Sequence, residues 1–244
     1  MSGLSIVIPT LNEAAYLGRT LRCLRLLEPP TAEIIVVDGG SQDETVTIAH
    51  NYGISAIPCP QAGRAIQMNQ GAQAATGEFL CFLHADTLVP PDLVTLIEIT
   101  LAEPQVACGG FISLMSGENT TRWGVSLHNY LKTYYAPLLF RPHLFFFQGL
   151  RLLFGDQVMF CRRNDFWQCG GFDSNLPIME DADLCLRLVR RGRIRLLNRV
   201  VQSSDRRVAE LGPLKANLIY VWVGFLWGLG VSATYLKRFY ADIR

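Results

Sequence analysis

The sequence predicts an α/β fold, in which a doubly wound and mostly parallel sheet carries helices on both faces. Short apolar runs alternate with segments of helical periodicity over the first half of the chain. The runs Ile34–Val37 and Phe79–Leu83 are apolar at consecutive positions, which indicates strands covered by helices on each side. The 244 residues are 50% hydrophobic and 18% charged, which allows a large core and excludes disordered and coiled-coil classes.

Each predicted element follows from the spacing of its apolar residues. Behind the strand Ser5–Ile8, the residues Ala14, Leu17, Leu21 and Leu24 recur at helical spacing. The remaining elements are strand Ile34–Val37, helix Thr45–Asn51, strand Ile54–Ile57, a helix over about 65–75, strand Phe79–Leu83 and helix Asp92–Leu101. Right-handed crossovers between these strands give the doubly wound sheet. After about residue 104 the alternation loosens, so the second half is less defined.

Polar residues stand where the predicted strands end. The first strand is followed by Pro9-Thr10-Leu11-Asn12-Glu13, the second by Asp38, and the fourth by His84-Ala85-Asp86. Ligands of such sheets bind beyond the carboxyl ends of the strands, so three strand ends bring polar groups to one rim. A single acid after a strand is usually a helix cap, but agreement among three ends favours a binding site.

The turns after the strands lack two common nucleotide-binding motifs. No G-x-G-x-x-G follows the first strand, which argues against a dinucleotide cofactor such as NAD or FAD. No G-x-x-x-x-G-K-[ST] occurs, which argues against a P-loop kinase or ATPase. Asp38 stands where an acid can accept hydrogen bonds from a ribose or a base. The pattern favours a mononucleotide held by strand ends and a metal.

The charge balance constrains the partners. A net charge of +1 gives no field that would mark a nucleic-acid binder. Of the 22 basic residues, 19 are Arg, and 15 of the 22 lie after residue 150. Guanidinium groups suit bidentate capture of phosphate, so the bias indicates an anionic partner, although lineage bias explains it equally well.

The apolar run Leu218–Leu236 has nineteen residues without a charge and precedes Lys237 and Arg238. Three interpretations are open: a helix packed in the fold or in an oligomer, a helix on a membrane surface, or a membrane span. A second apolar stretch, Tyr134–Phe154, is interrupted by charges and could lie on a membrane. The first residues lack the basic region of a signal peptide, and the seven cysteines form no C-x-x-C pair. We expect a cytoplasmic protein, or one at the cytoplasmic face of the membrane.

Four segments resemble motifs of family 2 glycosyltransferases, which have the GT-A fold. They are Ser5–Glu13, Glu33–Asp43, Gly77–Asp86, and Gly170–Asp173 followed by Met179–Leu184. Their order and spacing, over residues 4 to about 200, make the resemblance specific. Within the family, the chain is most similar to the bacterial subgroup of radical-SAM/selenodomain-associated transferase 2, which includes arsenosugar-biosynthesis glycosyltransferases. The features of that subgroup are His84–Thr87, Gly155–Gln157 and Ser204–Arg207.

The resemblance implies a role for each candidate residue. The expected contacts to the donor nucleotide are Pro9, Thr10, Glu13, Asp38, Arg64, Asp86, Arg206 and Arg207. Asp86 would bind Mg²⁺ or Mn²⁺. His84 replaces the first Asp of the family's Asp-x-Asp, and could ligate the metal or hydrogen-bond a phosphate.

The resemblance also implies roles on the acceptor side. Asp181 is the expected catalytic base, and the expected contacts to the sugar or acceptor are Asp156, Gln157 and Glu180. Simpler roles stay open for several candidates: Glu13 could complement a helix dipole, Arg64 could be a surface residue, and Asp156 and Gln157 could form a turn.

The implied activity is inverting, metal-assisted transfer of one sugar from a nucleotide-diphosphate sugar to the hydroxyl of an unidentified acceptor. A UDP-sugar is expected, and the missing Gln-x-x-Arg-Trp signature of processive synthases favours single-sugar transfer. The implied domains are a GT-A-like unit over 1–210, with a nucleotide-binding half over about 1–104 and an acceptor and catalytic half over about 105–210, and an apolar C-terminal helical segment over 211–244. Two alternatives remain, a nucleotidyltransferase with a similar sheet and a non-catalytic, membrane-associated sugar-nucleotide-binding protein. The oligomeric state is left open.

Overall fold

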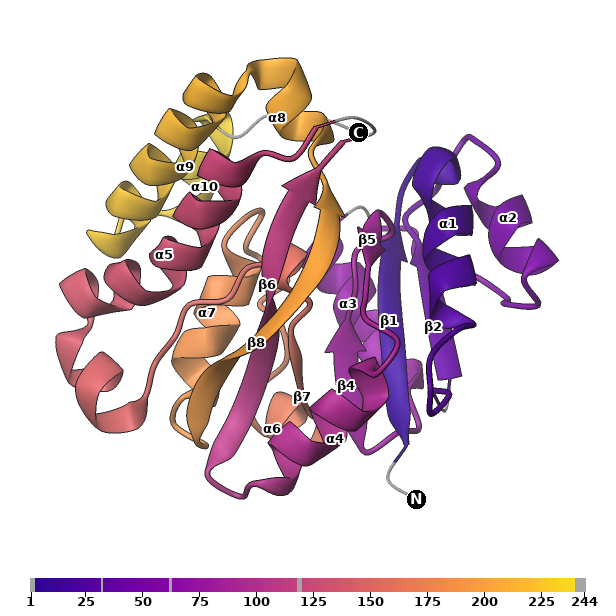
Figure 1. The fold of residues 1–244 in the computed structure, drawn as a ribbon, viewed down its shortest axis with the longest axis horizontal. Helices are drawn as coiled ribbons and strands as arrows, with labels where there is room; N and C mark the ends of the chain where they lie inside the picture. Colours follow the sequence, from indigo (N-terminus) through magenta and orange to yellow (C-terminus); the bar gives the residue numbers. More distant parts are fainter. Residues whose placement is uncertain (1–2, 32, 62, 118–119, 240–244) are drawn as a thin grey trace.

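The computed structural model describes residues 3–31, 33–61, 63–117 and 120–239. Its centre is an eight-stranded sheet in the order β3-β2-β1-β4-β7-β6-β8-β5 (Figure 1). The strands are β1 (Leu4–Thr10), β2 (Glu33–Asp38), β3 (Ile57–Pro58), β4 (Phe79–Phe82), β5 (Thr87–Leu88), β6 (Val106–Ser116), β7 (Phe160–Arg162) and β8 (Arg193–Ser204). The predicted α/β class is therefore confirmed.

The strand directions make the sheet mixed but mostly parallel. Strands β3, β2, β1 and β4 pair in parallel. Strand β7 runs antiparallel between β4 and β6, while β6 and β8 pair in parallel along almost their whole length. The short β5 pairs antiparallel with β8 at the sheet edge. The carboxyl ends of β1, β2, β4, β6 and β8 therefore point toward the same end of the molecule.

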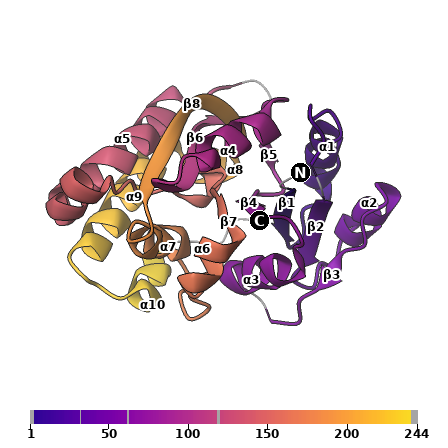
Figure 2. The same cartoon turned by 90° about the horizontal axis from the view of Figure 1, so that it is seen from below.

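Helices cover both faces of the sheet (Figures 1 and 2). One face is packed by α1 (Ala14–Leu24), α2 (Thr45–Asn51) and α4 (Leu93–Ala102), and the other by α3 (Arg64–Ala74), α6 (Arg163–Gln168) and α7 (Glu180–Leu188). Successive side chains of a strand point to opposite faces. In β1, Ile6 and Ile8 accordingly join the core beneath α1, whereas Val7 joins the core beneath α3.

The second half adds a helical layer, of which the sequence predicted only the C-terminal helical segment over 211–244. It contains α5 (Trp123–Phe140), α8 (Arg206–Leu211), α9 (Pro213–Gly228) and α10 (Ala233–Leu236), the π-helix η1 (Leu144–Gln148), and the 3₁₀ turns η2 (Gly155–Gln157) and η3 (Lys237–Phe239). Helices α5 and α9 lie against each other, and Val125, Val208 and Ala216 form a small core beneath them (Figure 1).

Two predictions about elements need correction. The uncharged run Leu218–Leu236 is divided between α9 and α10, because the chain turns at Gly230, whose φ is +92°. Within the described residues, no helix has both the length and the apolar character needed to cross a membrane, so the membrane-span interpretation is wrong. The predicted strand Ile54–Ile57 lies instead at Ile57–Pro58, because Ile54 still bonds to the end of α2 through Ala49.

Candidate active site

A cavity of about 460 Å³ lies at the carboxyl ends of the strands and extends beneath α5 and α9. Most of the predicted site residues line it, although they come from segments far apart in the sequence. They are Pro9, Thr10, Glu13, Arg64, His84, Asp86, Asp156, Glu180, Asp181, Arg206 and Arg207. The fold therefore brings the predicted nucleotide, metal, base and acceptor residues to one hollow.

Two predicted residues lie outside this lining. Asp38 is nearly buried at the end of β2, where its carboxylate accepts hydrogen bonds from the Thr10 hydroxyl (3.0 Å), the Gly40 amide (3.0 Å) and the Ser41 amide (2.8 Å). It therefore fixes the turn beside the cavity. Gln157 is fully buried, and its side chain bonds to the Thr133 hydroxyl and to the Phe154 amide. Its position is that of a structural residue beneath the cavity floor.

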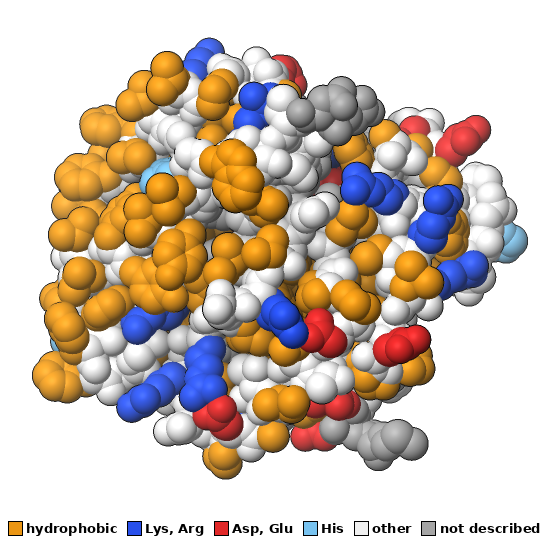
Figure 3. All heavy atoms as spheres, in the orientation of Figure 1, with side chains coloured by type: hydrophobic (Ala, Val, Ile, Leu, Met, Phe, Trp, Pro, Cys, Tyr) orange, Lys and Arg blue, Asp and Glu red, His pale blue; other side chains and the backbone are white. Residues whose placement is uncertain are grey.

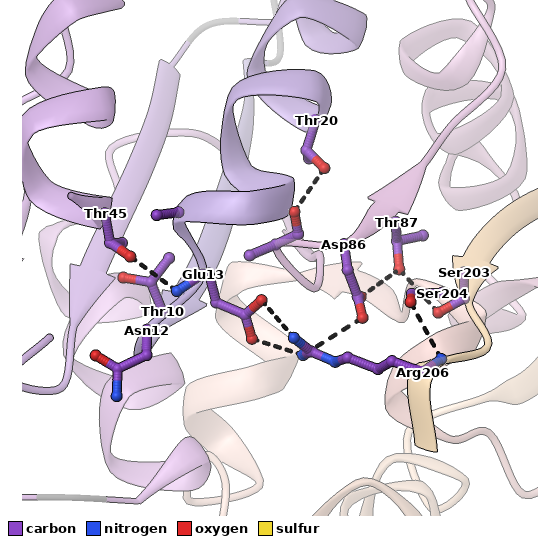
Figure 4. Close-up of polar contacts among 12 residues, drawn as sticks. Thr10, Asn12, Glu13, Thr20, Thr45, Asp86, Thr87, Ser203, Ser204 and Arg206 are labelled. Carbon is purple, nitrogen blue, oxygen red and sulfur yellow. Dashed lines mark hydrogen bonds and ion pairs between the residues drawn. The ribbon is translucent and has the colours of Figure 1, made fainter. Parts of the chain in front are cut away.

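An ion-pair network joins three of the predicted residues where β1, β4 and β8 end (Figure 4). Arg206, at the start of α8, donates to both carboxylate oxygens of Glu13, at 2.8 and 2.6 Å. The same guanidinium lies 3.4 Å from Asp86 Oδ2. All three side chains are largely shielded from solvent, so the pairing is screened less than a surface salt bridge. Arg206 thus supplies a cation beside Asp86.

The loop that carries Asp86 is held from both sides. Thr20 of α1 donates its hydroxyl to the Ala85 carbonyl at 2.6 Å, and Thr87 contacts Ser203 of β8 at 3.2 Å (Figure 4). Burial raises the pKa of Asp86, while the charge of Arg206 opposes this shift. The carboxyl group is therefore positioned by the strands around it, with Arg206 as a neighbouring cation.

Glu180 and Asp181 begin helix α7, which follows the glycine pair Gly170-Gly171 along the chain. Both glycines have positive φ, at +83° and +66°, so the turn needs residues without a Cβ. Glu180 lies 3.3 Å from Arg64 of α3. Burial, followed by the neighbouring Glu180 charge, raises the pKa of Asp181 to about 8. This is the environment of a carboxyl group that can exchange a proton near neutral pH.

His84 and Asp181 both lie beside Gly155. A Cβ added at Gly155 would overlap the His84 imidazole and would lie 3.1 Å from Asp181 Oδ2, so only glycine fits between them without a shift. The Nε2 atom of His84 is buried and has no hydrogen-bond partner among the described residues. Burial, together with the charges of Arg64, Arg206 and Arg207, keeps the pKa of His84 well below its usual value. The imidazole is therefore neutral, with a nitrogen available to a ligand.

These residues suit a divalent metal that arrives with a diphosphate. Among the described residues, no group of three or more His, Cys, Asp or Glu side chains could enclose a metal ion. Mg²⁺ is commonly bound by one or two carboxylates together with substrate phosphates and water. The carboxylate of Asp86 and the unpartnered Nε2 of His84 fit such a shared site, because substrate oxygens would supply the remaining ligands.

Helix α5 supplies residues that the sequence did not single out. His128, Asn129 and Lys132 line the far end of the cavity, and the Asn129 amide donates to the Asp156 carboxylate. The Lys132 ammonium lies 3.5 Å from the centre of the Phe154 ring. Burial lowers the pKa of Lys132 to about 8, whereas the charges of Asp156 and Asp181 act in the opposite direction. In the sequence, Lys132 differs from its surroundings only as one of three Lys among 22 basic residues, and this does not identify it as a site residue.

Comparisons with known proteins indicate the family of the chain. The family model described as "Glycosyl transferase family 2" covers residues 5–168. A PGL/p-HBAD biosynthesis glycosyltransferase of Mycobacterium bovis is 28% identical over 190 residues, which are 75% of this chain and 68% of the relative. The match to the family model therefore extends from strand β1 to the end of helix α6.

Two solved structures share the fold. One is a mannosyltransferase from Pyrobaculum calidifontis in complex with GDP-Man and Mn²⁺, with a TM-score of 0.69 and 18% identity, covering 93% of this chain and 64% of that one. The other is glucosyl-3-phosphoglycerate synthase from Mycobacterium tuberculosis in complex with Mn²⁺, UDP-glucose and phosphoglyceric acid, with a TM-score of 0.63 and 21% identity, covering 94% and 80%. The chain thus spans just under two thirds of the mannosyltransferase. At these identities the likeness establishes the GT-A type of fold.

Proposed function

Because the chain belongs to glycosyltransferase family 2, we propose that it transfers one sugar from a nucleotide-diphosphate sugar to an acceptor hydroxyl, with inversion and with the help of a divalent metal. The observation that carries the proposal is the convergence of Asp86, Arg206 and Asp181 on one cavity at the strand ends. These groups are a metal ligand, a cation for phosphate and a base, which are the three requirements of the reaction. The motifs at His84–Thr87 and Ser204–Arg207 support the finer placement in the radical-SAM-associated subgroup.

The nucleotide is proposed to lie along the ends of β1 and β2. Pro9, Thr10 and Glu13 border the cavity there, and Asp38 holds the adjoining turn. Carboxylate and hydroxyl oxygens at this position can accept hydrogen bonds from a ribose or a base. A uridine nucleotide is the proposed donor, as the glucosyl-3-phosphoglycerate synthase binds UDP-glucose.

The diphosphate is proposed to lie between the loop that carries Asp86 and the start of α8. Arg206 and Arg207 line this part of the cavity, and a guanidinium can hold two phosphate oxygens at once. Asp86 and His84 would hold Mg²⁺ or Mn²⁺, which neutralises charge on the departing diphosphate when bound. Arg64, which pairs with Glu180, is proposed to contact the phosphates from α3.

Asp181 is proposed to take the proton of the acceptor hydroxyl as that oxygen attacks the anomeric carbon. The hydroxyl would enter from the α5 end of the cavity, where Asp156 and Lys132 lie. A single attack from the face opposite the leaving diphosphate inverts the anomeric centre. Glu180 and Asp156 are the proposed contacts to the sugar and the acceptor. The seven free cysteines are consistent with a reducing compartment, and we propose the cytoplasm.

The proposal is tested by Asp181→Asn. Removing the base while keeping the side-chain volume is expected to reduce transfer about 10²- to 10⁴-fold, while donor binding measured by calorimetry stays within a few-fold. The matched control is Asp183→Asn on the same helix, whose carboxylate pairs with Arg187 at 2.6 Å and does not line the cavity. Transfer by Asp181→Asn at the rate of this control would remove Asp181 from the base role.

A further inference from the structure

Helices α5 and α9 carry apolar stripes that face outward. The exposed stripe of α9 consists of Leu214, Leu218, Val221, Trp222, Phe225 and Leu229. The exposed stripe of α5 consists of Trp123, Leu127, Leu131 and Leu138. In each stripe most members are separated by three or four residues, which places them on one side of the helix. The exposed Phe146 and Phe147 of η1 follow α5, and together with the two stripes they are called the apolar face.

The apolar face is conspicuous on the surface. Figure 3 shows hydrophobic side chains gathered along the side of the molecule where Figure 1 places α5 and α9. The inner side of α9 is apolar or small as well, since Ala216 and Val223 are buried, whereas the inner side of α5 also carries His128 and Lys132. A helix that is apolar all round is normally enclosed by protein or lipid. A contiguous exposed apolar surface therefore indicates an interaction site.

Most charges near the apolar face are basic, although Glu210 of α8 is exposed just before α9. From residue 122 to 155 and from 211 to 239 the sequence contains Arg and Lys but no Asp or Glu. Arg141, Lys215 and Arg238 are exposed. Basic residues at the edge of an apolar surface that includes Trp side chains suit anionic lipid headgroups. A second copy of the chain fits less well, because a two-fold contact would bring the same basic residues together.

We propose that the apolar face docks on the surface of an anionic lipid bilayer, with α5 and α9 lying in the headgroup region. Since no described helix could span a bilayer, the contact is peripheral. The inner sides of the same helices line the cavity through His128, Lys132, Tyr220 and Val223. Docking therefore places the acceptor end of the cavity next to the bilayer. Docking itself does not depend on whether the proposed transfer reaction takes place.

Co-sedimentation of the full chain with vesicles tests the docking. Vesicles of phosphatidylcholine with phosphatidylglycerol should bind the chain, and vesicles of phosphatidylcholine alone should bind it about tenfold less. The variant Leu218→Glu should lose about tenfold in binding, because it puts a negative charge into the apolar face. Leu26→Glu is the matched control, since Leu26 is 69% exposed and Leu218 70%, and Leu26 lies outside the apolar face. The control should bind as the wild type does.

Two further measurements decide between occupants. Lys215→Gln combined with Arg141→Gln should reduce binding to anionic vesicles without affecting the weak binding to neutral ones. Asp181→Asn should bind vesicles normally, so a failed transfer reaction would not affect the result. Equal binding by Leu218→Glu and the wild type would overturn the proposal. So would a wild-type dimer in sedimentation equilibrium that Leu218→Glu dissociates, with no vesicle binding.

Discussion

At the scale of single residues, the raised pKa of Asp181 determines how the reaction should respond to pH. Burial and the charge of Glu180 raise this pKa to about 8 in the ligand-free protein. A base must be deprotonated to accept a proton, so the active fraction increases with pH up to that value. The charge of Arg64 lowers the pKa of Asp181 and so opposes the effect of Glu180. Both partners of the Arg64–Glu180 ion pair therefore act on the pKa of Asp181 through their charges.

We expect kcat/KM for transfer to rise about tenfold per pH unit below about pH 8 and to level off above it.

The carboxyl group of Asp181 also makes the free energy of unfolding depend on pH. Its pKa is higher in the folded than in the unfolded chain, so its stabilising contribution is complete below about pH 4 and is lost as pH rises through about 8. Rate profiles, with urea unfolding of the wild type and Asp181→Asn at both ends of this range, check both expectations. A flat rate profile between about pH 6 and about pH 9 would contradict the assignment.

Arg206 has a different role, because it balances two acids that would otherwise repel each other. Replacing it in Arg206→Gln leaves Glu13 and Asp86 without their shared cation. We expect donor affinity to fall about tenfold to a hundredfold, since a lost hydrogen bond to a charged group costs about 1.5–3 kcal/mol. Binding of Mn²⁺ in the absence of donor should become tighter, because Asp86 no longer has a competing cation.

Calorimetry with UDP and electron paramagnetic resonance of free Mn²⁺ measure the two effects. The control is Arg199→Gln, which breaks the exposed pair between Arg199 and Asp92, 2.9 Å apart and remote from the cavity lining. Exposed pairs of this kind contribute little, so the control should behave as the wild type does. Unchanged Mn²⁺ and UDP affinities in Arg206→Gln would show that Arg206 does not compete for Asp86.

At the scale of elements, the packing of α3 on β1 depends on a glycine. A Cβ at Gly71 would overlap Cγ1 of Val7 and lie 3.1 Å from Cγ2 of Val37. We expect Gly71→Ala to destabilise the protein by about 1–3 kcal/mol through overpacking, despite the better helix propensity of Ala. In Gly18→Ala of α1, the new Cβ would meet its nearest neighbour, Ile48, at 3.6 Å, which is an ordinary contact. That substitution should be neutral or stabilising by up to about 1 kcal/mol.

Urea unfolding followed by circular dichroism compares the two variants directly. Both glycines lie inside helices, so a difference between them isolates the contact with the sheet from helix propensity. Similar free energies of unfolding for the two variants would mean that α3 can move away from β1 at little cost.

The sequence predicted most elements of the first hundred residues, but few of those that follow. Strands such as β1 and β4 are buried on both sides, so their apolar runs are visible without knowledge of the fold. Strand β7 has three residues and pairs with strands distant in sequence, so nothing local marks it. Helix α5 was missed because apolar residues such as Leu131 face outward while polar residues such as Asn129 and Thr133 face inward, so the usual amphipathic pattern is absent.

At the scale of the whole molecule, the candidate site could be predicted only in part. Residues that follow apolar strands, such as Glu13 and Asp86, were found because the carboxyl ends of parallel strands meet at one edge. Asn129 and Lys132 reach the same cavity from α5, whose position depends on packing against α9 and the sheet. Gln157 stood next to Asp156 in a promising motif, yet the 3₁₀ turn directs it into the protein interior.

Helix α9, which lines one side of the cavity, comes later in the chain than the strands of the sheet. Strands β1 to β4 leave the ribosome first, because chains emerge from their N-terminus. Until α9 follows, the nucleotide-facing strand ends exist without the wall that Tyr220, Val223 and Gly224 provide. During synthesis the strand ends therefore emerge before this side of the cavity can form.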